Sequence, residues 1–126
     1  MASIQDEFNT TFIDLASQLA ILCPRSFIAN NVSLLKSLIH SHPTKILEIF
    51  TLKALKYKRQ VDSGDDSFFL NCNFASEVNG DSAIIGKIFE LKEIWKTLND
   101  ANRDIVRQYV TYLFELSAEY LETIVV

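Results

Sequence analysis

Residues 101–124 read ANRDIVRQYVTYLFELSAEYLETI, and this stretch decides the fold. Apolar side chains recur along it at intervals of three and four residues, which is the period of an α-helix, and they form two adjacent stripes. One stripe is Ile105, Tyr109, Tyr112, Leu116 and Tyr120, and the other is Val106, Val110, Leu113 and Leu121. A helix that is apolar over so wide an arc is usually surrounded by neighbours, so we expect this one to be the central helix of a bundle.

The preceding sequence predicts four further helices, which gives a single all-α domain, a bundle of about five helices over residues 1–126. They are expected at about residues 3–22, 27–39, 44–59 and 81–98, from apolar stripes of the same period. Pro24 and Pro43 separate the first three helices, because a proline disfavours helical backbone in the residue before it. Ser3 can cap the first helix, and Asn99 offers a turn before the last one.

Composition supports a compact helical domain and excludes several other classes. The chain has 126 residues, 48% of them hydrophobic, with 3 Gly, 2 Pro, 2 Cys and a net charge of −4. The apolar content is too high for a disordered chain, and two cysteines make no disulfide framework. So few Gly and Pro also disfavour a β-sandwich or barrel, which needs many turns.

The sequence predicts an intracellular protein that is neither secreted nor embedded in a membrane. The opening residues 1–8, MASIQDEF, lack the basic start and apolar run of a signal peptide. The longest apolar run, at residues 19–23, is far shorter than the roughly 20 residues that a membrane span needs.

Residues 60–81 break the helical pattern and are expected to form an acidic loop. They carry five acidic residues, no Lys or Arg, and two of the three glycines. Within them lies an aromatic run made of Phe68, Phe69, Leu70 and Phe74. Consecutive aromatic residues cannot all point inward from one short element, so this run is a candidate partner-binding anchor. The pattern leaves open that these side chains instead pin the loop onto the core.

A second candidate surface is basic. Lys45, Lys53, Lys56 and Arg59 fall within an arc of roughly 120° on the helix expected at residues 44–59. Such a face suits phosphates or an acidic partner, although the net charge of −4 disfavours a general nucleic-acid binder. Two alternatives stay open, namely an ordinary solvated helix face and a contact with the acidic 60–81 segment.

The sequence contains few patterns that are typical of a catalytic or metal-binding site. His40 and His42 are two residues apart and do not face each other on a helix, and zinc sites usually show tighter Cys/His spacing. Cys72 sits in an acidic segment, where nearby negative charge suppresses the thiolate. The sequence also lacks a Gly-rich phosphate loop and a nucleophile motif. We therefore expect no enzyme, no metal site and no cofactor.

Four segments of the C-terminal region resemble a known family. They are residues 94–98 (IWKTL), 102–106 (NRDIV), 109–110 (YV) and 113–116 (LFEL). Together they are similar to the C-terminal signature of small helical proteins of nucleocytoplasmic large DNA viruses, of the phycodnavirus and mimivirus-like kind. The resemblance implies a viral protein with a non-enzymatic structural or interaction role in the infected cell or the virion, and it supplies no catalytic residues.

The expected partner is accordingly a viral or host protein. A nucleic-acid-associated factor using the basic face is the alternative function, and the sequence leaves a homo-oligomer open.

Overall fold

The computed structural model describes residues 3–54, 57–64 and 92–124, and within these ranges the protein is all-α, as predicted. The helices are α1 (Ile4–Leu22), α2 (Phe27–Ser41), α3 (Lys45–Ala54), α4 (Lys58–Asp62), α7 (Lys92–Thr97) and α8 (Asp100–Ile124). None of the helices in these ranges combines the length and the apolar character needed to cross a membrane.

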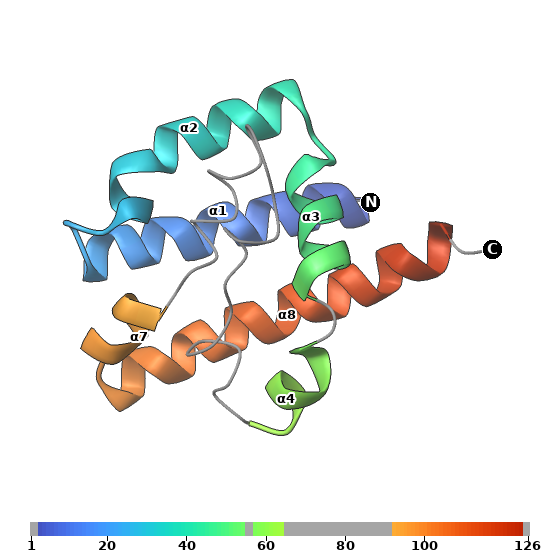
Figure 1. The fold of residues 1–126 in the computed structure, drawn as a ribbon. Coiled ribbons are helices and arrows are strands. Elements are labelled where there is room, and N and C mark those ends of the chain that lie inside the picture. Colours follow the sequence, from blue (N-terminus) through green and yellow to red (C-terminus); the bar gives the residue numbers. More distant parts are fainter. Residues whose placement is uncertain (1–2, 55–56, 65–91, 125–126) are drawn as a thin grey trace.

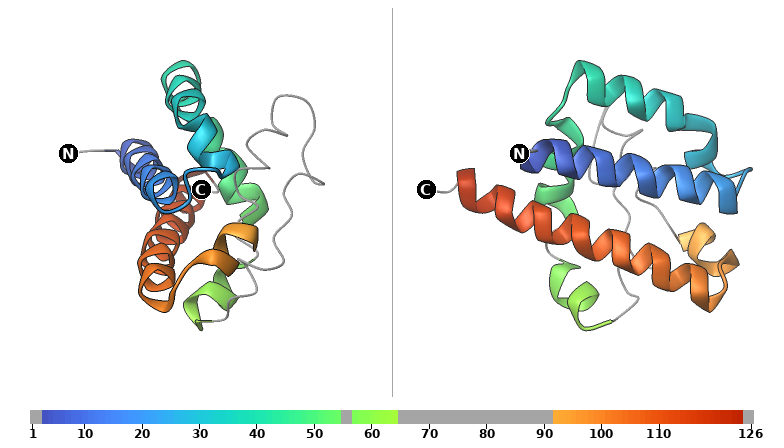
Figure 2. Two further views of the ribbon diagram at one scale, coloured as in Figure 1. Left: turned by 90° about the vertical axis from the view of Figure 1, so that its left-hand side faces the viewer. Right: turned by 180° about the vertical axis from the view of Figure 1, so that it is seen from behind.

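The described helices form two layers (Figures 1 and 2). In one layer α2, α1 and α8 lie side by side, with α1 in the middle and antiparallel to α8. The second layer consists of α3, α4 and α7 and covers one side of the first. In it α3 crosses α8 and contacts α1, while α4 and α7 pack near α8. The long helices α1 and α8 therefore have an inner side, which faces α3, and an outer side, which these three helices leave uncovered.

The core lies on the inner side and is dominated by aromatic rings. Phe50 of α3 makes edge-to-face contacts with Phe8 of α1 and Phe114 of α8, with ring centroids 5.4 Å and 5.0 Å apart. Phe12 stacks on Phe8 one turn away. Such ring pairs add to the free energy gained from burying the rings themselves. One cluster of phenylalanines thus joins three helices that are far apart in the chain.

Short polar side chains fix the starts of three helices. The Ser3 hydroxyl accepts a hydrogen bond from the Asp6 amide at 3.1 Å, as predicted, and Ser26 caps α2 in the same way from the Ala29 amide at 3.2 Å. At the start of α8, Asn99 Oδ1 accepts from the Asn102 amide at 2.8 Å. Each contact satisfies a backbone donor that has no partner inside the helix.

The prediction of one continuous helix over residues 44–59 is wrong. Helix α3 ends at Ala54, and α4 starts separately at Lys58 after Tyr57, which has a 3-10 conformation; residues 55 and 56 lie outside the described part of the chain. The break lets α4 turn toward α8 and bury Val61, a tertiary gain that local sequence preferences do not reveal. Since α4 extends to Asp62, the first three residues of the predicted 60–81 loop are helical. The chain leaves α4 through Gly64, whose φ of +81° favours glycine.

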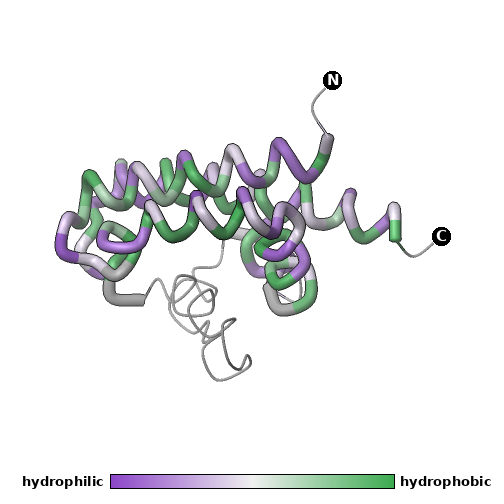
Figure 3. Tube along the Cα trace, turned by 90° about the horizontal axis from the view of Figure 1, so that it is seen from above, coloured by the Kyte–Doolittle hydropathy of each residue, from purple (hydrophilic) through white to green (hydrophobic). Residues whose placement is uncertain are grey.

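The C-terminal helix is central in that α8 packs against α1, α3 and α4, but α1 shares this role because it also contacts three helices. Each apolar stripe of α8 is only partly buried. Val106, Val110 and Leu113 are buried, but Leu121 of the same stripe is exposed; in the other stripe Leu116 is buried, whereas Ile105 and Tyr112 remain 43% and 40% exposed. Hydrophilic and hydrophobic segments accordingly alternate along the long helices (Figure 3). Among the described helices, α8 is therefore surrounded on one side only, and its outer side keeps Ile105 and Tyr112 exposed.

Candidate interaction surface

The predicted site residues fall largely outside the described part of the chain. The aromatic run of Phe68, Phe69, Leu70 and Phe74 lies outside it altogether. Of the predicted basic face, Lys56 and the side chain of Lys53 also lie outside it. Lys45 is half-buried in α3 and Arg59 is exposed in α4. Because these two residues belong to separate helices, the arc projected for one continuous helix does not apply to them.

The outer side of α1 and α8 offers a surface that the sequence patterns did not single out. Helix α1 contains three acidic residues and no Lys or Arg. The part of α8 that follows Arg107 contains three further acidic residues and no basic residue. We call this surface the outer α1–α8 face; its members are Asp6, Glu7, Thr10, Thr11, Asp14, Ile105, Gln108, Tyr112, Glu115 and Glu119. It combines carboxylates of one sign with exposed apolar groups on two long helices.

Tyr112 and Glu7 form the contact that joins the two helices across this face. The Tyr112 hydroxyl donates a hydrogen bond of 2.9 Å to Glu7 Oε2. This hydrogen bond raises the pKa of Tyr112 above its ordinary value of 10.0, and desolvation and the charges of Glu7, Glu119 and Glu115 act in the same direction. The phenol is therefore a fixed hydrogen-bond donor at neutral pH.

A shallow hollow of about 350 Å³ opens beside this contact. Its lining consists of Asp6, Glu7, Thr10, Thr11 and Tyr112. The lining offers carboxylates, hydroxyls and one aromatic ring, which suit a cationic side chain with an apolar stem.

Ile105 adds an apolar contact point to the same face. It lies seven residues before Tyr112, so both side chains point to the same side of α8, two helical turns apart. With equal rise along the two antiparallel helices, the Glu7–Tyr112 contact places Ile105 at about the level of Asp14. An exposed Ile and Tyr on one side of a rigid helix are the kind of anchor found at protein interfaces.

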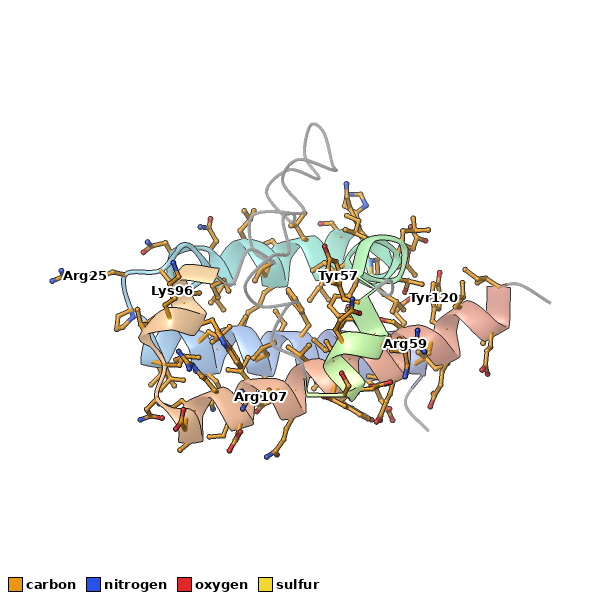
Figure 4. The ribbon with its side chains drawn as sticks, turned by 60° about the horizontal axis from the view of Figure 1, so that its bottom comes forward. Arg25, Tyr57, Arg59, Lys96, Arg107 and Tyr120 are labelled. Atoms are coloured by element: carbon orange, nitrogen blue, oxygen red, sulfur yellow. The ribbon has the colours of Figure 1, made fainter. Side chains whose placement is uncertain are left out.

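Most of the described basic side chains lie elsewhere, and a group of them gathers at one end of the bundle. Figure 4 shows Arg25, Lys96 and Arg107 at the end where the α1–α2 connection, α7 and the start of α8 meet. There Arg103 Nε donates to the Trp95 carbonyl at 3.0 Å, and the guanidinium groups of Arg103 and Arg107 lie 5.4 Å and 5.0 Å from the buried Trp95 ring. These two arginines thus hold α7 against α8 through hydrogen bonding and cation–π contacts.

Side chains that could bind a metal ion do not gather in the described part of the chain. No three or more His, Cys, Asp or Glu side chains within residues 3–54, 57–64 and 92–124 are placed to hold a metal ion together. His40 and His42 are exposed at the end of α2, while Cys23 contacts the Thr97 hydroxyl at 3.5 Å near its start. The helix α2 therefore separates the two histidines from this thiol.

Comparison with known proteins adds no relative. Neither the protein-family models, nor the curated proteins, nor the solved structures give a match to this chain. The geometry of the described residues and the composition of their surfaces therefore carry the functional argument.

The sequence did contain a signal for the outer α1–α8 face. Two long helices without a basic residue on α1 or on the second half of α8 are visible in the sequence itself. The two stretches are about a hundred residues apart in the chain, so the sequence alone does not show that they lie side by side. The contact between α1 and α8 brings them together into one surface.

Proposed function

We propose that this chain is a non-enzymatic viral interaction or structural protein that acts through protein–protein contacts in the infected cell or the virion. The observation that supports this proposal most is the outer α1–α8 face, where Ile105 and Tyr112 stay exposed among carboxylates on the two longest helices. Exposed apolar side chains rimmed by polar ones are a common mark of a binding surface. The viral part of the proposal rests on the resemblance of the C-terminal region.

The chemistry of this face suits binding better than catalysis. A phenol is ordinarily protonated at neutral pH, and the raised pKa of Tyr112 moves it further from ionisation, so a role as nucleophile or general base would require loss of this proton. Its hydroxyl is already engaged with Glu7 across the helix interface. Tyr112 therefore offers a ring surface and a fixed donor.

Site-specific photocrosslinking tests the proposal. A photoreactive amino acid replaces Ile105 on the outer α1–α8 face or, as a matched control, the exposed Ser37 of α2. We expect protein adducts from infected cells or purified virions at Ile105 and few at Ser37. A folded protein that gives no adduct at Ile105 in either material would contradict the proposal.

The alternative function, a nucleic-acid-associated factor, draws on the cations that lie away from this face, including Lys45 and Arg59. It predicts binding to DNA or RNA that weakens steeply with salt, because phosphate contacts release counterions. The measurement is binding to a labelled duplex and a labelled single strand at about 50 mM salt, where such contacts are strongest. Absence of binding under those conditions would remove this alternative.

A further inference from the structure

We infer that the partner of the outer α1–α8 face is a basic amphipathic helix, which lays its apolar residues on Ile105 and Tyr112 and its Lys or Arg side chains against Glu7, Glu115 and Glu119. This inference rests on the proposed function and names the kind of partner that the face fits. Helices that dock in this way are bound through side chains three, four and seven residues apart.

The charge on the face selects a cationic partner. Tyr112, Glu115, Glu119 and Glu122 follow one another at intervals of three, four and three residues, so they form a single exposed stripe along α8. Glu7 and Asp14 are exposed on the neighbouring α1. A helix lying along this stripe would meet carboxylates at the spacing at which its own side chains recur.

The hollow beside Tyr112 provides a place for one cation. Glu7 Oε2 accepts the hydrogen bond from Tyr112, and the carboxylate keeps further acceptor capacity for an incoming donor. The aromatic ring of Tyr112 lies next to this carboxylate in the lining of the hollow. A guanidinium group can use both at once, because it pairs with carboxylates and stacks on aromatic faces.

Other occupants fit this face less well. A second copy of the chain related by two-fold symmetry would bring the same acidic stripe against itself. A head-to-tail contact would have to use the exposed Arg25 and Lys96 at the α7–α8 end, because Arg103 is bound to Trp95 and Arg107 pairs with Asp104 at 2.5 Å. Nucleic acids and anionic membranes carry the same sign of charge as the face. A basic helix of another protein is the occupant that the charges favour.

The test uses the full chain and a defined probe. The probe is a fluorescent 18-residue helical peptide of Ala, Leu and Arg, with leucines seven residues apart and arginines flanking them on the same side. Two control peptides replace the arginines with glutamates or scramble the leucine positions. Binding is measured by fluorescence anisotropy and located on the protein by NMR chemical-shift changes.

The matched variants remove three carboxylates from different places. One carries Glu7→Gln, Glu115→Gln and Glu119→Gln on the outer α1–α8 face, and the other carries Glu48→Gln, Asp62→Asn and Asp100→Asn away from it. All six residues are exposed, and circular dichroism checks that both variants stay helical. The two variants therefore have equal net charge. Besides the place of the lost charge, the control variant loses the Lys58–Asp62 ion pair and the face variant loses the carboxylate that accepts the Tyr112 hydrogen bond.

We expect the arginine peptide to bind the wild type at about 50 mM salt and to weaken strongly at about 300 mM, since exposed charges are screened over about a Debye length. The face variant should bind about tenfold more weakly and the control variant less than about twofold more weakly. Shift changes should centre on Ile105 and Tyr112. The absence of peptide binding at low salt, or equal losses in the two variants, would overturn the inference.

This experiment separates the inference from the proposed function. Adducts at Ile105 from infected cells or virions, together with no binding of the arginine peptide, would leave the proposed function standing and overturn the basic-helix partner. Peptide binding without any adduct at Ile105 would support the chemistry of the face and count against the proposed function.

Discussion

The inner and outer sides of α1 and α8 differ sharply, although they belong to the same two helices. On the inner side, Phe8 and Phe114 are fully buried and meet Phe50 edge to face. On the outer side, one hydrogen bond between Tyr112 and Glu7 spans exposed helix surfaces that carry only negative charge. Within the described ranges, the two helices are therefore held together mainly by the inner aromatic core, and the Tyr112–Glu7 hydrogen bond joins them on the outer side.

The largest effect expected from this comparison is on the inner side. Phe50→Ala removes a ring that touches partners on both α1 and α8 and leaves a cavity among them, so we expect a loss of about 3–5 kcal/mol in the free energy of unfolding. The measurement is urea denaturation followed by circular dichroism. Leu52→Ala, two residues away but 74% exposed, is the control and should cost less than about 0.5 kcal/mol. Equal losses for the two variants would refute the inner aromatic core.

A smaller loss is expected at Asn9, the polar residue on the inward part of α1. Its side-chain amide donates a hydrogen bond of 2.8 Å to the Pro43 carbonyl and so ties α1 to the connection between α2 and α3. Asn9→Ala leaves that carbonyl without this donor but also removes the buried Asn9 Oδ1, which has no hydrogen-bond partner, so it should cost about 0.5–1.5 kcal/mol in the free energy of unfolding. Asn30→Ala, at an exposed position of α2, is the matched control and should cost nothing measurable. If Asn9→Ala matched its control, the tie to Pro43 would contribute no stability.

The sequence was sufficient to predict the elements that depend on local signals. The Ser3 cap, the breaks at Pro24 and Pro43 and the long last helix all follow from residue types at fixed spacings. The break between α3 and α4 did not follow, because no Pro or Gly marks it and Val61 gains its burial from α8.

The candidate surface could be predicted less well than the fold. Ile105 and Tyr112 recur with the same period as the buried Leu116 of their stripe, so periodicity alone does not separate the exposed residues from the core ones. What distinguishes it is the neighbourhood of Glu7, which comes from a helix more than a hundred residues earlier in the chain. A surface assembled from two distant helices has no local sequence signature.

On the outer side, removal of charge should leave stability nearly unchanged. Glu115→Gln with Glu119→Gln takes away two exposed carboxylates that repel Glu7, so we expect the free energy of unfolding to stay within about 0.5 kcal/mol of the wild type or to rise slightly. Thermal and urea denaturation at low and high salt provide the measurement. A clear destabilisation would mean that these carboxylates support the fold, and the division between the two sides of α8 would then be wrong.

The smallest effect concerns the proton on Tyr112. Because Glu7 is the main cause of its raised pKa, Glu7→Gln should bring the pKa of Tyr112 back toward 10.0, whereas Asp100→Asn, at the far end of α8, should not. Folding holds this proton more tightly than the unfolded chain does, so the contribution of the contact is complete below about pH 10 and is lost as the pH rises through the pKa of the folded protein. The measurement is an NMR titration of tyrosine labelled with ¹³C at Cζ. An unchanged Tyr112 titration in Glu7→Gln would mean that the hydrogen bond across the outer α1–α8 face does not form in solution, and the hollow beside it would lose the fixed donor on which the fit to a cationic side chain depends.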